Sequence, residues 1–217
     1  MAKDIQGTTV VVTGGASGIG FAIADSFLQH GARLAILLDL NEIHAAEAAK
    51  NLNTKHGHNK AAFIKCDVTK DLEKVTKTIL DTYKTVDVLV NSAGIVNERN
   101  PKKVIELNVT AVIEWSLKYL EIMRSDRGGK GGTIVNVSSI YGFMVDPYLP
   151  TYKASKYAVL GFTRSKGHEY NFKKTGVRLF AICPGITNTN LYGAFFGKDH
   201  KCDFIIIVSR RVFMRLR

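Results

Sequence analysis

A buried-strand pattern that runs directly into a glycine-rich turn constrains the fold of this 217-residue chain most strongly. Residues 9–13 are a short β-branched run, which is typical of a buried strand. Residues 14–20 then carry Gly14, Gly18 and Gly20, and apolar residues at helical spacing follow. Glycines at this place let backbone N–H groups approach a pyrophosphate, whose charge the helix N-terminus favours. The pattern predicts a nucleotide phosphate site, with an ordinary tight turn as the alternative.

Strand-like and helix-like segments alternate along the rest of the chain. Strands that alternate with helices indicate an α/β fold, a doubly wound parallel sheet with helices on both faces. No linker divides the alternating segments, so a single domain is expected. The predicted strands are residues 9–13, 33–39, 61–68, 86–91, 133–137 and 177–182. One predicted helix starts near residue 21, and four more span residues 42–50, 71–83, 101–124 and 152–172.

The second predicted strand ends in an acid, Asp39, which lies 25 residues after Gly14. This is near the distance at which a carboxylate meets the adenosine ribose hydroxyls of a dinucleotide. Such a carboxylate repels a 2′-phosphate, and the glycine turn contains no Lys or Arg that would attract one. The pattern favours NAD over NADP. A solvent-facing acid at a strand end is the alternative.

Tyr152 and Lys156 are four residues apart, so on a helix they share one face. A phenol beside an ammonium is suited to forming phenolate near neutral pH. Lowering the phenol pKa from ~10 to ~7 takes ~4 kcal/mol of preferential stabilisation of the anion. On spacing alone, an ordinary helix surface is the commoner explanation. Asn108, in the middle of a predicted helix, also needs a reason, either a side-chain bond to backbone or a site.

Taken together, these motifs resemble the short-chain dehydrogenase/reductase family over about residues 7–192. The family's T-G-x-x-x-G-x-G matches residues 13–20, its adenine-pocket D-V matches 67–68, and its P-G-x-x-x-T matches 184–189. Its N-N-A-G appears at 91–94 with Ser as the second residue. Within the family the chain is most similar to the NAD-dependent branch of 15-hydroxyprostaglandin dehydrogenase-like enzymes and insect alcohol dehydrogenases.

The resemblance implies a Rossmann-type domain with strand order 3-2-1-4-5-6 that transfers a hydride reversibly from a secondary alcohol to NAD. Tyr152 as phenolate is expected to take the alcohol proton, and Lys156 to lower its pKa and hold the nicotinamide ribose. Ser139 is expected to bind the substrate oxygen, and the family spacing of 13 residues before Tyr152 selects it over Ser138. Asn108 is expected to anchor a water relay to Lys156.

The resemblance also assigns the remaining site residues, and no metal is expected. Apolar side chains are expected around the substrate, although each is equally suited to core packing. Leu149 stands where prostaglandin-oxidising relatives carry Gln, which favours a less polar alcohol or ketone. Substrate contacts are expected from Ser139, Tyr141, Phe143, Leu149 and Tyr192. Cofactor contacts are expected from Gly14, Ser17, Gly18, Ile19, Gly20, Asp39, Cys66, Asp67, Val68, Asn91, Ala93, Gly94, Tyr152, Lys156, Pro184, Gly185, Ile186, Thr187 and Thr189.

Charge and cysteine content indicate which binding partners and which cellular compartment to expect. The net charge of +11 comes without a nucleic-acid motif, so no nucleic acid is expected. The three cysteines show no pairing or metal spacing, which suits a reduced, cytoplasmic protein. No apolar run reaches the ~18 residues of a membrane span. The family usually assembles through the helices that carry Asn108 and Tyr152, so a homodimer or homotetramer is expected.

The end of the chain departs from the family pattern. The catalytic NAD-binding domain is expected to span residues 1–197, with an atypical basic tail over 198–217. Residues 204–208 are apolar enough for an improvised seventh strand. The alternative is that this strand is missing and strand six forms an exposed edge. A shortened end also leaves open a catalytically silent NAD-binding protein.

Overall fold

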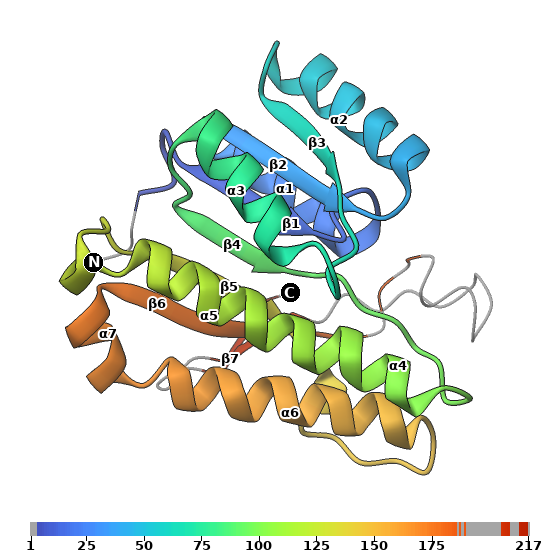
Figure 1. The fold of residues 1–217 in the computed structure, drawn as a ribbon. Coiled ribbons are helices and arrows are strands. Elements are labelled where there is room, and N and C mark those ends of the chain that lie inside the picture. The colour runs from blue at the N-terminus through green and yellow to red at the C-terminus, as the bar shows by residue number, and fades with distance from the viewer. Residues whose placement is uncertain (1–3, 186, 188, 190–204, 209–212, 217) are drawn as a thin grey trace. The chain divides into compact units, whose positions relative to one another are not determined.

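The computed structural model describes residues 4–185, 187, 189, 205–208 and 213–216 (Figure 1). Its residues cluster into two compact units, Met1–Ala93 and Gly94–Arg217. No helix within the described ranges is long and apolar enough to cross a membrane.

The first unit is built on four parallel strands in the order β3-β2-β1-β4. Val11 on the inner strand β1 pairs with Ile36 and Leu89, and Val10 to Val12 are fully buried. Strands covered on both faces need continuous apolar runs, which explains the β-branched pattern. Helices α1 and α3 lie on opposite faces of these strands (Figure 1). The elements are β1 (Thr9–Thr13), α1 (Gly18–Gln29), β2 (Leu34–Asp39), α2 (Glu42–His56), β3 (Ala61–Lys65), α3 (Leu72–Tyr83) and β4 (Val88–Asn91).

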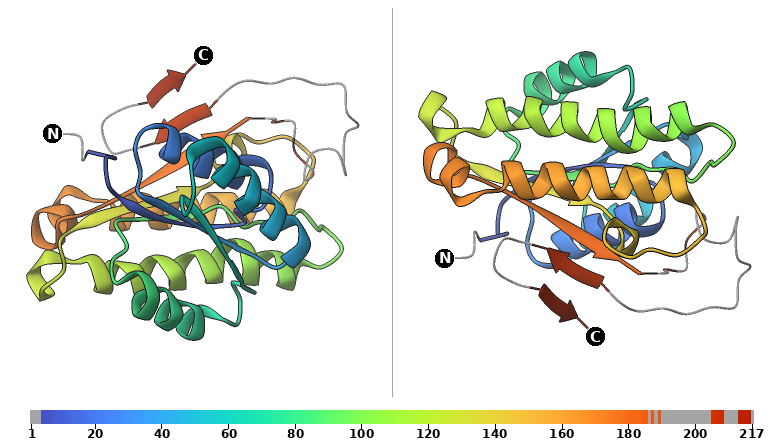
Figure 2. Two further views of the ribbon diagram at one scale, coloured as in Figure 1. Left: turned by 90° about the horizontal axis from the view of Figure 1, so that it is seen from above. Right: turned by 90° about the horizontal axis from the view of Figure 1, so that it is seen from below.

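The second unit pairs β5 with β6 in parallel and covers them with helices. Helices α5 and α6 lie side by side against these strands (Figures 1 and 2). The predicted helix over 101–124 is present, but its middle turns are π-helical. The elements are α4 (Pro101–Ile105), the π-helix η1 (Glu106–Ala111), α5 (Val112–Met123), the 3₁₀ turn η2 (Ser125–Arg127), β5 (Gly132–Val137), the 3₁₀ turn η3 (Ile140–Gly142), α6 (Pro150–Lys166), α7 (Glu169–Thr175) and β6 (Val177–Pro184).

Strand six has a partner on its outer edge. Strand β7 (Ile205–Val208) pairs antiparallel with β6, and β8 (Phe213–Leu216) pairs antiparallel with β7 (Figure 2). The prediction of an improvised seventh strand is therefore confirmed, and the alternative prediction, that strand six forms an exposed edge, is wrong. Its antiparallel direction removes the need for the long crossover that a parallel neighbour requires.

The predicted helix over 152–172 is wrong at its end, because α6 stops at Lys166 and a separate helix α7 follows. At Gly167 the backbone approaches β6 so closely that a Cβ would lie 2.1 Å from the Leu179 carbonyl oxygen. The His168 ring then caps α7 by accepting a hydrogen bond from the Tyr170 N–H at 3.2 Å. The close approach to β6 and the new cap together break the helix.

Other boundaries shift by a few residues. The third strand stops at Lys65 instead of residue 68, because the Asp67 carboxylate accepts bonds from the Thr69 N–H (3.0 Å) and hydroxyl (2.7 Å) and forms a turn. Helix α2 runs to His56 instead of residue 50. The His56 ring bonds the Asp25 carboxylate of α1 at 2.6 Å, which ties the extra turn to the unit.

Candidate active site

The glycine turn of the first unit has geometry that side chains would block. Gly14 (φ +64°) and Gly18 (φ +53°) adopt left-handed backbone, which favours glycine. A Cβ on Gly14 would lie 2.9 Å from the Ala93 Cα, and one on Gly20 would lie 2.2 Å from the Gly14 carbonyl oxygen. Ser17 precedes α1 without a side-chain cap bond. The first N–H groups of α1 are therefore suited to receive an anion.

Asp39 ends strand β2 next to this turn. Its carboxylate accepts a hydrogen bond from the Ala16 N–H at 3.1 Å and one from the Asn41 N–H at 3.1 Å. The two bonds fix a negative charge beside the glycine turn. This is the local arrangement that the sequence predicted for a ribose-binding acid.

Thr13 is a positioning residue that sequence reasoning passed over. Its buried hydroxyl accepts bonds from the Ser92 N–H (3.0 Å) and the Ala93 N–H (3.1 Å), just after β4 ends. Its strand partner is the buried Asn91. Thr13 thus holds the residues that follow β4 against the glycine turn. The available signal was its place as the first residue of the glycine motif.

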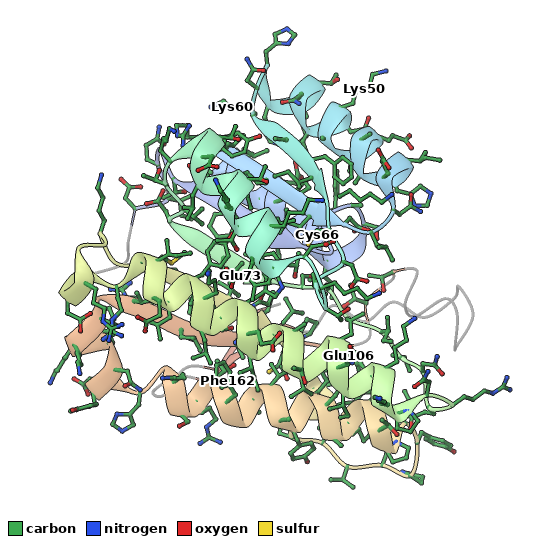
Figure 3. All side chains as sticks on the ribbon, viewed as in Figure 1. Lys50, Lys60, Cys66, Glu73, Glu106 and Phe162 are labelled. Carbon is green, nitrogen blue, oxygen red and sulfur yellow. The ribbon has the colours of Figure 1, made fainter. Side chains whose placement is uncertain are left out.

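The residues after β3 are held by local bonds. The Thr69 hydroxyl holds the pKa of the Asp67 carboxyl below its usual value, so Asp67 is a fixed carboxylate. Burial and neighbouring carboxylates raise the pKa of the Cys66 thiol to about 12 (Cys66 is labelled in Figure 3). The Cys66 N–H donates to the Asp39 carbonyl at 2.9 Å. Cys66 thus contributes backbone and packing here, and Val68 beside it is buried.

In the second unit, Tyr152 and Lys156 are both buried on α6, at 8% and 6% exposure. The Lys156 Nζ lies 5.4 Å from the centroid of the Tyr152 ring, which confirms the predicted shared helix face. The same ammonium donates to the Val137 carbonyl at 3.0 Å. The end of β5 and the first turns of α6 therefore meet around this cation.

The two serines after β5 have separate partners. Ser139 shares a hydrogen bond with the Tyr152 hydroxyl, and its own hydroxyl accepts from the Tyr141 N–H at 3.2 Å. The Ser138 hydroxyl donates to the Lys156 carbonyl at 3.0 Å. Of this pair, Ser139 faces the phenol and Ser138 supports the backbone of α6.

Burial has the largest influence on the pKa values of Tyr152 and Lys156. It raises the pKa of Tyr152 to about 12, with the Ser139 hydrogen bond opposing the rise. It also lowers the pKa of Lys156 to about 8, which leaves the ammonium largely charged at neutral pH. Desolvation of the phenolate is the largest influence on the pKa of Tyr152, and the effect expected of Lys156 stays a prediction.

Asn108 lies in the π-helical segment and is almost fully buried. Its Oδ1 accepts from the Ile95 N–H at 2.9 Å, and its Nδ2 donates to the Ile95 carbonyl at 2.8 Å. Nδ2 also donates to the Ser155 hydroxyl at 3.1 Å, and that hydroxyl donates to the Tyr152 carbonyl at 2.6 Å. The bond to backbone expected of this mid-helix Asn is present, and its place in a water relay to Lys156 stays a prediction. Asn108 joins the segment after Gly94 to helix α6.

Glu98 is a second functional residue that sequence reasoning missed. Its two carboxylate oxygens accept from the Thr151 N–H and the Tyr152 N–H, each at 2.9 Å, so it caps α6. Burial raises the pKa of Glu98, but these N–H groups outweigh it and leave the pKa below its usual value. The cap comes from 53 residues upstream, so no local capping pattern signals it.

The predicted substrate residues differ in where they lie. The Tyr141 ring packs edge-on to the Tyr152 ring, with centroids 6.4 Å apart, whereas Phe143 packs against buried Leu160, Ala181 and Cys183. Leu149 precedes α6 with a left-handed backbone (φ +54°). Tyr192 and the cofactor residue Ile186 lie outside the described residues.

The predicted nicotinamide residues that are described lie after Ala93 and after β6. A Cβ on Gly94 would stand 3.7 Å from the Lys156 Nζ, so this glycine borders the Lys156 ammonium. Pro184 ends β6 and accepts from the Ser139 hydroxyl at 3.5 Å. Past it, the Thr187 hydroxyl donates to the Gly185 carbonyl at 3.1 Å, and Thr189 is half-buried.

Fold and site together define a short-chain dehydrogenase: the family model described as "short chain dehydrogenase" matches residues 8–199, and the chain belongs to that family. Its strand order, 3-2-1-4-5-6, is that of a Rossmann-type fold. The chain is an oxidoreductase of this family.

The individual relatives agree with this class. The chain is 39% identical over 203 residues to 15-hydroxyprostaglandin dehydrogenase [NAD(+)] of Rattus norvegicus, covering 93% of this chain and 76% of that protein. It is 31% identical to alcohol dehydrogenase 1 of Ceratitis cosyra, covering 86% and 73% of the two chains. A 3-ketoacyl-(acyl-carrier-protein) reductase from Brucella melitensis, complexed with NADH, superposes with a TM-score of 0.79 at 25% identity, covering 88% and 80%. Other solved structures with this fold hold NAD or NADP, so the fold itself fits either cofactor.

Proposed function

We propose that this chain oxidises an apolar secondary alcohol to the ketone with NAD, reversibly, and that Tyr152 is the general base. The observation that carries the proposal is the buried Tyr152 hydroxyl, which shares a hydrogen bond with Ser139 beside the Lys156 ammonium. That arrangement places one acid–base group, one hydrogen-bonding hydroxyl and one cation together. Membership of the short-chain dehydrogenase family supports the same chemistry.

These side chains have distinct tasks in the proposed oxidation. Bound NAD supplies the electrophilic ring carbon that accepts the hydride, together with a positive charge. Ser139 holds the alcohol oxygen, and the Tyr152 oxygen takes its proton as the hydride leaves the carbinol carbon. Lys156, largely protonated at neutral pH, favours the phenolate electrostatically and holds the nicotinamide ribose. Asn108 positions the backbone after Gly94 and the first turn of α6.

NAD is the proposed cofactor, in preference to NADP. Asp39 supports this choice, because its carboxylate is fixed by the Ala16 and Asn41 N–H groups and would repel a 2′-phosphate. We assign the adenosine and pyrophosphate to residues of the first unit, Gly14, Ser17, Gly18, Ile19, Gly20, Asp39, Cys66, Asp67, Val68, Asn91 and Ala93. We assign the nicotinamide riboside to Gly94, Tyr152, Lys156, Pro184, Gly185, Ile186, Thr187 and Thr189.

The proposed substrate is a secondary alcohol that is recognised mainly by apolar contacts. Tyr141 packs edge-on against Tyr152, so an aromatic side chain borders the phenol, and Leu149 stands immediately before α6. The similar rat protein is named for 15-hydroxyprostaglandin, and the similar insect protein for alcohol. Leu149 offers no hydrogen bond to a polar substrate chain, which favours the less polar alcohols.

The test is NADH formation from NAD and a panel of secondary alcohols, with Tyr152→Phe as the variant. We expect turnover by the native chain and a loss of at least ~100-fold in kcat for the variant, with NAD binding retained. Unchanged turnover by Tyr152→Phe would contradict the assigned base. NAD binding without turnover of any alcohol by the native chain would instead favour the catalytically silent alternative.

We also propose that the chain forms a homodimer or homotetramer through the helices that carry Asn108 and Tyr152. Three large apolar side chains on these helices, Ile105, Leu117 and Tyr157, are 38–41% exposed, which supports an interface there. Sedimentation of Leu117→Lys and Tyr157→Glu should show weaker association than the native chain. Unchanged association of both variants would place any interface elsewhere.

A further inference from the structure

Helix α6 buries a second lysine beside the catalytic pair. Lys153 is only 6% exposed, so its ammonium must be neutralised and hydrogen-bonded within the protein. It forms an ion pair with the Asp146 carboxylate and donates to the Asp146 carbonyl at 2.8 Å and to the Tyr148 carbonyl. The three N–H donors of the ammonium thus have three acceptors, all from residues 146–148. A lysine so fully engaged is not free to bind a ligand directly.

The same cluster reaches the reacting phenol through one aromatic side chain. The Asp146 carboxylate also accepts a hydrogen bond from the Tyr141 hydroxyl. The Lys153 ammonium lies 4.8 Å from the centroid of the Tyr141 ring. That ring in turn meets the Tyr152 ring edge-on, at 6.4 Å between centroids and an interplanar angle of 86°. A chain of contacts therefore runs from Lys153 through Asp146 and Tyr141 to Tyr152.

The loop that carries Asp146 has little apolar packing at its tip. Met144, Val145 and Tyr148 are 48%, 83% and 69% exposed. The loop then enters α6 through Leu149, whose left-handed backbone is unusual for a branched residue and is disfavoured before a proline. A loop that is weakly packed at its tip and strained at its end needs a specific restraint. The buried ion pair supplies one.

We propose that Lys153, through its ion pair with Asp146, is a positioning residue that holds Tyr141 and the loop of residues 143–149 against the Tyr152 hydroxyl and so limits the size of the alcohol admitted. The proposal rests on the proposed alcohol dehydrogenase function. Displacements of about 1 Å at a reacting group are enough to change rates ~100-fold. Loosening the loop therefore changes how well a bulky alcohol is held, while NAD contacts of the first unit stay as they are.

The experiment is a double-mutant cycle with Lys153→Met, Asp146→Asn and the combined variant. Arg164→Met, which removes an exposed cation from the same helix, is the matched control, and Lys153→Arg is the conservative variant. We measure kcat and KM for 2-propanol and for 1-cyclohexylethanol, the NAD dissociation constant, and the rate of chymotrypsin cleavage within residues 141–148.

We expect each single variant to change the ratio of the two KM values by about 10-fold, and the double variant to do no more, because one interaction is removed in each case. The NAD dissociation constant of every variant should stay within about 2-fold of the native value. The KM ratio of Lys153→Arg and that of Arg164→Met should also stay within about 2-fold of the native ratio. Additive effects, an unchanged KM ratio, or an equal change in Arg164→Met would overturn the proposal. Asp146→Asn keeps the shape of the side chain and decides the question if Lys153→Met does not fold.

Cleavage of the loop separates failure of this proposal from failure of the proposed function. If the native chain turns over no alcohol, the alcohol dehydrogenase proposal fails, but the restraint is still tested. Loop cleavage should then be at least ~10-fold faster in Lys153→Met and in Asp146→Asn than in the native chain. In the double variant it should be no faster than in either single variant. Unchanged cleavage in both single variants would show that the ion pair does not hold the loop.

Discussion

At the scale of single residues, Tyr152 lies in surroundings that oppose its ionisation. Burial raises its pKa to about 12, and only groups that favour the anion can bring it back toward neutral pH. The hydrogen bond with Ser139 acts in that direction. A charged Lys156 acts in the same direction, since its Nζ lies 5.4 Å from the ring centroid. The proposed mechanism at neutral pH therefore depends on keeping this lysine protonated.

Replacing Lys156 by Met should raise the pH that the reaction requires. In the proposed mechanism Tyr152 acts in its deprotonated form, so the rate of alcohol oxidation should rise with pH up to the Tyr152 pKa. Losing the cation raises that pKa, so the rising limb of kcat against pH should move to higher pH, with a loss of roughly 100-fold at neutral pH. Lys156→Arg keeps the charge and should shift the limb less. A limb that does not move would show that Lys156 acts on binding alone.

Replacing Asp39 by Asn should relax the choice of cofactor. The amide keeps an acceptor oxygen for the Ala16 N–H but removes the charge that would face a 2′-phosphate. We expect the KM for NADP to fall by about 10-fold, with Asp39→Glu as the charge-retaining control. Steady-state kinetics with both cofactors measures the effect. An unchanged preference for NAD in Asp39→Asn would mean that this carboxylate does not meet the ribose.

At the scale of elements, the catalytic helix α6 begins without a cap from its own sequence. Leu149 occupies the N-cap position and makes no side-chain bond, and Glu98 supplies both acceptors instead. Asn108 secures the same end through Ser155. Two segments distant in sequence therefore determine where the Tyr152 hydroxyl lies.

Glu98→Ala should cost about 1 kcal/mol of unfolding free energy, the usual value for a lost N-cap, and should lower kcat because Tyr152 is in the uncapped turn. The pKa of Glu98 in the folded protein is below its ordinary value, so its stabilisation is present at neutral pH and is lost as pH falls through the folded-state pKa. Urea unfolding at several pH values should show the native chain and Glu98→Gln converging in acid. A constant difference between them would contradict a charge-dependent cap.

At the scale of the whole molecule, the sequence predicted the elements that have a local pattern. Three features could be predicted because each depends on neighbouring residues. They are the strand–glycine–helix unit, the alternation of strands and helices, and the shared helix face of Tyr152 and Lys156. Helix ends were less readable. The break after Lys166 depends on how closely Gly167 approaches β6, which no local pattern encodes.

Long-range contacts were the part of the site that the sequence did not predict. The cap by Glu98, the support of Ser92 and Ala93 by Thr13, and the bonds of Asn108 to Ile95 join segments that only the fold brings together. The burial of Tyr152 could not be predicted for the same reason. Spacing indicated the nearby cation but not the depth of burial, which is the larger effect.

The most direct test of the central claim is hydride transfer from a secondary alcohol deuterated at the carbinol carbon. We predict one deuterium in each NADH formed, found by mass spectrometry, and at least ~100-fold slower formation of labelled product by Tyr152→Phe. Unlabelled NADH, or equal labelling by native chain and variant, would contradict the account.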